Sequence, residues 1–113
     1  SNCATCIEEM PLLNEIKLKF GNEVNFISIT FENQNEVTDF LKQKEFNFTH
    51  VVNSKEYLKS FGFFGYPKTL ILDKDLIIIE IEKGIPKNTV NLDQNKMELK
   101  KRIINKLNEL KKR

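Results

Sequence analysis

The sequence is poor in the residues that carry most metal and disulfide chemistry: its 113 residues include two cysteines, one histidine and no tryptophan. So few cysteines exclude a disulfide-rich scaffold. They also argue against a structural zinc site, because such a site takes four ligands and the two cysteines with His50 supply three. The chain therefore has to fold around an ordinary hydrophobic core.

Long hydrophobic runs and an excess of one charge are also missing. The longest apolar stretch, residues 70–81, is interrupted by charged residues, so no segment reaches the roughly 18 to 20 apolar residues that cross a bilayer. The 18 basic and 16 acidic side chains are interspersed and leave a net charge of +2. This balance disfavours nucleic acid or an anionic membrane surface as a partner. We predict no membrane insertion of this segment and no nucleic-acid binding.

Length and composition are those of one globular domain. Hydrophobic residues make up 40% of the chain and charged residues 30%, which is close to ordinary usage for packed proteins. No internal repeat and no Gly/Ser-rich or Pro-rich linker divides the sequence. We therefore expect residues 1–113 to form a single domain.

Hydrophobic periodicity predicts alternating helices and strands. The first helix is expected over residues 6–20, ending at Gly21 and disturbed at Pro11. Its apolar face is formed by residues at three- and four-residue spacing: Met10, Leu13, Ile16 and Phe20. The later elements are expected in this order: a strand over 24–30, a helix over 35–44, a strand over 49–52, a helix over 54–61 capped by Ser54, two strands over 68–72 and 76–82, and a helix over 92–112.

The order of these elements predicts an α/β sandwich. Helical crossovers imply parallel strands, and the short polar turn at residues 73–75 implies an antiparallel hairpin at one edge. The last helix should bury Leu99, Ile103, Leu107 and Leu110 and expose its lysine-rich face. A helix near the N-terminus of such a fold normally follows a strand, yet no strand precedes this one in the sequence.

The chemistry points to Cys3 and Cys6, which are separated by two residues at the start of the first helix. This spacing lets the two sulfur atoms meet across one helical turn. Unpaired backbone N–H groups and the positive end of the helix dipole lower the pKa of a thiol at the helix N-terminus. Cys3 is then the nucleophile, and Cys6 is the resolving thiol that attacks a mixed disulfide. The alternative is a pair of inert thiols or a static disulfide, although so short a loop constrains the unfolded chain very little.

Two stretches resemble thioredoxin-like proteins of the TlpA/ResA type. Residues 3–11 read CATCIEEMP and match the family pattern CxxCxxEMP. Residues 61–73 read FGFFGYPKTLILD and are similar to the family stretch YGVxGxPTTFLID. The resemblance implies a thioredoxin-like fold, with a mixed central sheet flanked by helices and the final helix closing the fold. It also implies thiol-disulfide exchange by a redox-active disulfide, with no metal or organic cofactor.

The resemblance assigns roles to individual residues. Cys3 and Cys6 are the expected catalytic pair, and Glu9 is expected near them, where it would tune thiol ionisation. Pro67 matches the family's cis proline, and Tyr66 with Pro67 would present backbone polar groups to an extended substrate segment. The alternative for Pro67 is an ordinary trans turn proline, and the alternative for Glu9 is a plain first-turn helix acid, which the helix dipole favours in any case. Glu8 is the more solvated of the two glutamates.

Departures from the family pattern limit what the resemblance implies. Asn2 stands where the family has an aromatic residue, and Ala4-Thr5 replaces the common dipeptides between the cysteines. The redox potential therefore stays open between about −270 mV, as in thioredoxin, and about −120 mV, as in DsbA. The family also has a central strand before the cysteine helix. Either the chain is a fragment truncated at its N-terminus, which we favour, or another segment or a second molecule fills the position. A monomer and a strand-exchanged dimer are the alternatives.

The expected partners are the thiols and disulfides of other proteins, with cytochrome c maturation components among them. The resemblance implies a periplasmic or otherwise extracytoplasmic bacterial protein, and a cytoplasmic location remains the alternative. The competing functional class is a redox-inactive thioredoxin-like binding module, and a peroxide-reducing relative is a third. We expect His50 to be an ordinary half-exposed strand residue, and Phe61 and Phe63 to lie in the core.

Overall fold

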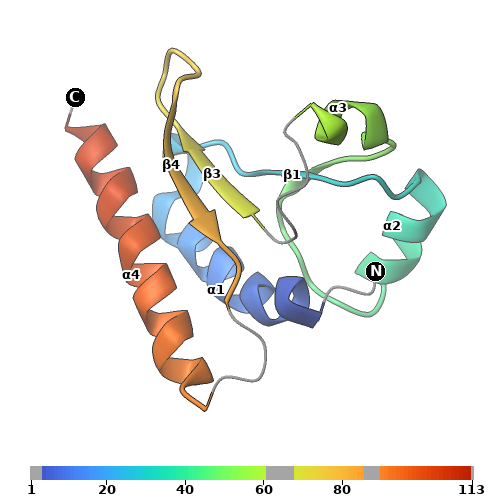
Figure 1. Ribbon diagram of the computed structural model, residues 1–113, viewed down its shortest axis with the longest axis horizontal. Helices are drawn as coiled ribbons and strands as arrows, with labels where there is room; N and C mark the ends of the chain where they lie inside the picture. The colour runs from blue at the N-terminus through green and yellow to red at the C-terminus, as the bar shows by residue number, and fades with distance from the viewer. Residues whose placement is uncertain (1–3, 61–67, 86–89, 113) are drawn as a thin grey trace. The chain divides into compact units, whose positions relative to one another are not determined.

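The computed structural model describes residues 4–60, 68–85 and 90–112, which form two compact units (Figure 1). The first unit contains the described part of residues 13–64, and the second contains that of residues 3–12 and 65–113. Helix α1 (Ala4–Phe20) contributes its first half to the second unit and its second half to the first. Each unit is described in turn.

Helix α1 is continuous through Pro11 and ends where the sequence predicts. The short 3₁₀ turn η1 (Gly21–Glu23) follows it, and Gly21 adopts the left-handed φ of +57° that favours glycine at a helix C-terminus. The predicted apolar face is partly wrong. Leu12, Ile16 and Phe20 are buried, whereas Met10 and Leu13 are only half-buried. The buried stripe therefore follows the series 9, 12, 16 and 20 and includes the carboxyl group of Glu9.

The first unit contains a parallel strand pair. Strand β1 (Ile27–Ile29) pairs with β2 (Thr49–Val51), and α2 (Gln34–Leu41) lies in the connection between them. Both strands are shorter than predicted, because pairing extends over only three residues of each. A capping box starts α2: the Asn33 side chain accepts a hydrogen bond from the N–H of Glu36, and the Glu36 carboxylate accepts one from the N–H of Asn33.

The remaining elements of the first unit are α3 and a cluster of aromatic rings. Helix α3 (Lys55–Lys59) begins at the predicted place, but the hydroxyl of Ser54 donates to the carbonyl of Val52 and does not cap the helix. The ring of Phe46 stacks on Phe48 at 4.5 Å, and the Phe26 ring lies 5.2 Å from that of Phe48. These contacts join the start of β2 to the chain before β1.

Asn14 ties the second half of α1 to the loop that leads into β2. Its side-chain Nδ2 donates to the carbonyl of Glu45 at 2.9 Å, and its Oδ1 accepts from the N–H of Asn47 at 2.9 Å. Lys17, one turn further along α1, also donates to the carbonyl of Asn47. Because Asn14 is 9% exposed, its two hydrogen bonds satisfy an amide that is largely withdrawn from water.

The second unit contains the predicted antiparallel hairpin. Strand β3 (Lys68–Leu72) pairs with β4 (Ile78–Lys83) in the register Thr69 to Glu82 and Ile71 to Glu80, with an irregularity after Ile71. The predicted start of the second strand at residue 76 is wrong. Asp73 Oδ1 accepts hydrogen bonds from the N–H groups of Asp75 and Ile77, which extends the turn through residue 77.

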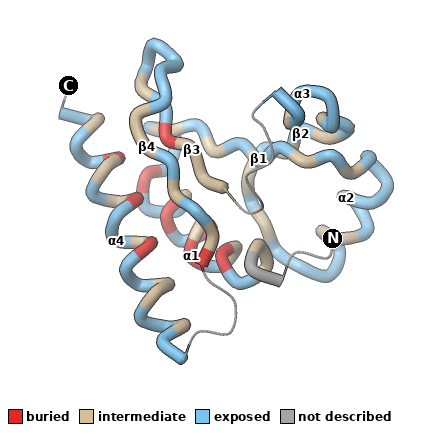
Figure 2. The backbone as a smooth tube through the Cα atoms, viewed as in Figure 1, coloured by how far each residue is buried: buried red, intermediate tan, exposed pale blue. Residues whose placement is uncertain are grey.

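Helix α4 (Leu92–Lys111) runs beside the hairpin and completes the second unit. Leu99 and Ile103 are 1% and 3% exposed and Leu107 is also buried, as the spacing predicts, whereas Leu110 is half-buried. Figure 2 shows the buried positions on α1, β3 and α4. The core of this unit consists of Leu12, Ile71, Ile85, Leu99, Ile103 and Leu107.

In the described residues, four strands form two two-stranded sheets, β1–β2 and β3–β4. Within residues 4–60, 68–85 and 90–112, β1 and β3 therefore have one strand partner each. Ile27 and Ile29 of β1 are 55% and 39% exposed. The mixed α/β architecture agrees with the thioredoxin-like prediction.

Candidate active site

Cys6 lies in the first turn of α1, half-buried and disulfide-bonded. The sequence contains one other cysteine, Cys3, which is outside the described residues. Tyr66 and Pro67, together with the expected core residues Phe61 and Phe63, also fall outside them. Of the residues predicted for the site, the structure therefore places Cys6 and Glu9.

Glu9 follows Cys6 by three positions on α1, so the two side chains are neighbours on one side of the helix. The Glu9 side chain is 2% exposed, and its Oε2 accepts a hydrogen bond from the N–H of Ile85 at 3.3 Å. The alternative interpretation, a plain first-turn helix acid, is wrong, because Glu9 lies in the second turn of α1 and is buried. Glu8 is exposed, as expected, and pairs with Lys96 at 2.5 Å.

Burial raises the pKa of Glu9 from its ordinary value of 4.5 to about 6. The charged form loses its hydration in the protein interior, and this effect is larger than the opposing hydrogen bond from Ile85. The negative charge of Glu82 on β4 raises the pKa further. Glu9 therefore exchanges its proton close to neutral pH, which is the range useful for acid–base work.

Glu82 is held by Arg102 of α4. Arg102 Nε lies 3.1 Å from Oε1 and 3.2 Å from Oε2 of Glu82, and one terminal nitrogen lies 3.1 Å from Oε1. The Glu82 side chain is only 11% exposed, whereas that of Arg102 is 53% exposed. This hydrogen-bonded pair raises the pKa of the guanidinium above its ordinary value.

Glu82 and Arg102 belong to neither family motif, although a pattern in the sequence points to them. Glu80 and Glu82 are two residues apart on β4, a rise of about 6.6 Å, and Arg102 and Lys106 are four apart on α4, a rise of about 6 Å. Two acids on a strand thus match two bases on a helix. The structure pairs Lys106 with Glu80 at 3.7 Å, parallel to the pair of Arg102 and Glu82.

His50 is a half-buried strand residue, as predicted. Its Nε2 lies 2.9 Å from the carbonyl oxygen of Phe46, and its Nδ1 lies 2.5 Å from Oγ of Ser28 on β1. Because a carbonyl oxygen only accepts, Nε2 donates to Phe46, and Nδ1 shares a hydrogen bond with the Ser28 hydroxyl, which can donate or accept. The bond to Ser28 joins β2 to β1, the bond to Phe46 joins β2 to the preceding loop, and together they account for both ring nitrogens of His50.

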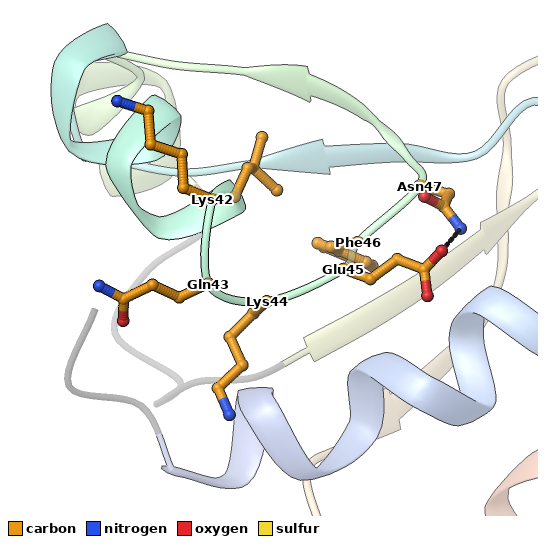
Figure 3. Close-up of a pocket in the computed structure, with 7 residues that line it drawn as sticks. Lys42, Gln43, Lys44, Glu45, Phe46 and Asn47 are labelled. Atoms are coloured by element: carbon orange, nitrogen blue, oxygen red, sulfur yellow. Dashed lines mark hydrogen bonds between the residues drawn. The ribbon is translucent and has the colours of Figure 1, made fainter.

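The first unit also contains a hollow of about 440 Å³ beside the loop of residues 41–47. Figure 3 shows the side chains of Lys42, Gln43 and Lys44 diverging from the loop, with Asn47 bonded to Glu45. The residues that line it include no cysteine or histidine. Across the part of the chain that the structure describes, no group of three or more His, Cys, Asp or Glu side chains is arranged to hold a metal ion, and no helix has the length and apolar character to span a membrane.

Comparisons with known proteins define the class of this chain. The family model described as Redoxin matches residues 1–99, so the chain belongs to the Redoxin family. A crystal structure of a DsbE thiol:disulfide interchange protein from Chlorobium tepidum has a TM-score of 0.67 and 18% identity, and the match covers 87% of this chain and 72% of that one. This likeness shows the thioredoxin-like fold.

Curated relatives agree with the resemblance drawn from the two motifs. The thiol-disulfide oxidoreductase ResA of Bacillus thuringiensis and that of Bacillus cereus are each 29% identical over 85 residues, covering 73% of this chain and 49% of each relative. The thioredoxin-like protein YneN of Bacillus subtilis is 22% identical over 86 residues, covering 73% and 51%. The chain thus spans about half the length of the curated relatives it matches, and the resemblance to TlpA/ResA-type proteins is confirmed.

Proposed function

We propose that this chain is a thiol-disulfide oxidoreductase that exchanges a Cys3–Cys6 disulfide with the cysteines of protein substrates. The observation that carries the proposal is the disulfide-bonded Cys6 in the first turn of α1, one turn before the buried carboxyl group of Glu9. A cysteine pair at a helix N-terminus favours the thiolate that such exchange requires.

The exchange consists of two substitutions at sulfur. In the reducing direction, the Cys3 thiolate attacks one sulfur of a substrate disulfide, and the other substrate sulfur leaves as a thiolate. The Cys6 thiolate then attacks the sulfur of Cys3, which forms the intramolecular disulfide and releases the second substrate thiolate. Two electrons pass from the chain to the substrate, and the reverse sequence oxidises a substrate dithiol.

Other residues support these steps in the proposal. Glu9 gives up or takes a proton near neutral pH beside the Cys6 thiol. Tyr66 and Pro67 bind the substrate backbone near Cys3, as the family motif implies. The proposed setting is extracytoplasmic, with protein disulfides as substrates and cytochrome c maturation components among the candidates. The names of the ResA and DsbE relatives support thiol-disulfide exchange.

An equilibrium redox titration in dithiothreitol or glutathione buffers tests the proposal. The free thiols of Cys3 and Cys6 are alkylated and counted by mass spectrometry at each buffer potential. We expect one reversible two-electron transition, with a potential between about −270 and −120 mV. Cys3→Ser should abolish exchange, whereas Cys6→Ser should accumulate a mixed disulfide with a model substrate. Retained exchange in Cys3→Ser, or thiols that never pair reversibly, would favour a redox-inactive binding module instead.

A further inference from the structure

One face of the β3–β4 hairpin is covered by α4. Glu82 of β4 bonds to Arg102 of α4 at 3.1 Å. Glu80, two residues earlier on the strand, lies 3.7 Å from Lys106 of the same helix. Ile71 of β3, which pairs with Glu80, is 5% exposed. Because successive side chains of a strand point to opposite faces, the residues next to these point away from α4.

The face that points away from α4 is apolar and exposed. Leu70 and Leu72 of β3 pair there with Ile81 and Ile78 of β4. Leu72, Ile78 and Ile81 are 41%, 43% and 54% exposed, and Leu70 is half-buried. These four residues are called the apolar hairpin face. Large aliphatic side chains that are exposed together on one face are typical of an interaction surface.

The charges at the two ends of this face have opposite signs. At one end Lys68 pairs with Lys83, so both lysines belong to the same side of the hairpin as Ile81. At the other end the turn contains two acids and one base, Asp73, Lys74 and Asp75, with a net charge of −1. A twofold axis that lies parallel to the face and perpendicular to the strands brings the basic end of one copy to the acidic turn of another. The face is therefore complementary to itself in both apolar character and charge.

We propose that the apolar hairpin face is the interface of a homodimer, in which the hairpins of two copies pack face to face with their strands antiparallel. Sheets that pack in this way lie about 10 Å apart, and the side chains of the two faces interdigitate. Lys83 of each copy then lies near Asp75 of the other, so the symmetry produces this pair twice. Burial of aliphatic side chains stabilises the dimer, and the charge pairs favour the antiparallel orientation. The inference concerns association and does not depend on disulfide exchange.

The first test is the oligomeric state of the intact, oxidised chain, measured by sedimentation equilibrium over a range of concentrations. We expect a reversible equilibrium of monomer and dimer, and a non-reducing denaturing gel should show no disulfide between copies. Ile81→Lys should weaken the dimer at least about tenfold, because it places a charge within the apolar face. Met97→Lys is the matched control, because Met97 is 67% exposed on α4, which covers the other face. It should leave the dissociation constant unchanged.

A charge exchange tests the orientation of the two copies. Lys83→Glu and Asp75→Lys each place like charges opposite one another, and each should weaken the dimer by about two- to fivefold. The double variant restores opposite charges at both pairs, so its dissociation constant should lie within about twofold of that of the parent. Since Lys83 and Asp75 are both exposed, all three variants should keep the fold, which circular dichroism checks.

A dimer that responds in these ways supports the proposal. A chain that stays monomeric at every concentration would overturn it, and this is the result expected if the face is covered within one chain. A dimer that Ile81→Lys leaves intact, as expected for strand exchange, would overturn it as well. The same holds for open-ended association, and for a double variant that dimerises no better than the single ones. A chain that lacks disulfide exchange would refute the proposed function and leave this test unchanged.

Discussion

The backbone N–H of Ile85 donates a hydrogen bond of 3.3 Å to Oε2 of Glu9, although the two residues lie 76 positions apart in the sequence. Both are buried, at 6% and 2% exposure. This contact joins the helix that carries Cys6 to the end of the β3–β4 hairpin within one compact unit. Burial of this carboxyl group raises its pKa, whereas the hydrogen bond from Ile85 lowers it. The resulting pKa is about 6.

The raised pKa of Glu9 predicts a pH-dependent stability. Between the ordinary value of 4.5 and about 6, the folded chain binds more protons than the unfolded chain, so stability decreases as pH rises through this window. The ionised form of Glu9 then costs about 2 kcal/mol above pH 6. In Glu9→Gln the side chain still accepts from Ile85, and the variant should be more stable than the parent at pH 7 by up to about that amount and similar to it at pH 4.

Urea unfolding of the oxidised chain at pH 4 and pH 7 measures this difference. Glu8→Gln is the matched control, because Glu8 is the adjacent residue but is exposed and paired with Lys96. The control should change stability by less than about 1 kcal/mol and keep the pH dependence of the parent. A Glu9→Gln variant that loses stability between pH 4 and pH 7 as steeply as the parent would show that another group is responsible.

The two hydrogen bonds of Asn14 predict a specific loss of stability in the first unit. In Asn14→Ala the carbonyl of Glu45 and the N–H of Asn47 both lose their partner, which should cost about 1 to 3 kcal/mol. Asn14→Asp retains the acceptor for Asn47 but loses the donor for Glu45, so it should cost less than alanine at neutral pH. The measurement is chemical unfolding, with amide hydrogen exchange at Asn47. Unchanged protection of that amide in Asn14→Ala would contradict the assignment.

The sequence predicted the order and type of the elements because their hydrophobic periods are regular. The predicted boundaries of elements were wrong where a polar side chain that is not part of the hydrophobic pattern forms the hydrogen bond that ends or starts the element. Asp73 extends the hairpin turn to residue 77, and Asn33 starts α2 one residue earlier than expected. The buried face of α1 differs from the predicted one, because Leu12 is buried where Met10 was expected. Both residues fit a helical spacing, so the spacing alone does not distinguish them.

The two family motifs predicted part of the candidate site. The CxxCxxE pattern predicted Cys6 and Glu9 as site residues, and their roles in exchange remain predictions. Glu82 and Arg102 were missed because they belong to no motif and are separated by 20 residues. Their pairing depends on how α4 lies against β4, which is a property of packing, and charged residues on a strand and a helix are most often simply solvated.

Core packing in the second unit predicts a large effect at Leu99. This side chain is 1% exposed on α4, so Leu99→Ala should lower the free energy of unfolding by about 2 to 5 kcal/mol through lost burial and the cavity left behind. Met97→Ala is the control on the same helix, because Met97 is 67% exposed, and it should change stability by less than about 0.5 kcal/mol. Urea unfolding compares the two. Equal effects at both positions would mean that α4 is not packed through the face containing Leu99.

The left-handed backbone conformation of Leu76 predicts that a glycine at this position stabilises the hairpin. Leu76 lies in the turn between β3 and β4, it has a left-handed φ of 65°, and its side chain is 77% exposed. A non-glycine residue pays roughly 1 to 2 kcal/mol for this conformation, whereas glycine adopts it freely but loses more chain entropy on folding. Leu76→Gly should therefore raise the free energy of unfolding by about 0.5 to 1 kcal/mol.

Lys74→Gly is the control for this effect, because Lys74 lies in the same turn without a positive φ. There glycine adds only its entropic cost, so the variant should be less stable than the parent by roughly 0.5 to 1 kcal/mol. The test compares the free energies of unfolding of the two glycine variants, measured by heat or urea. Because both substitutions add the same conformational entropy to the unfolded chain, their difference reports the backbone conformation at residue 76. A Leu76→Gly variant that loses as much stability as Lys74→Gly would show that the backbone at residue 76 is not left-handed in solution.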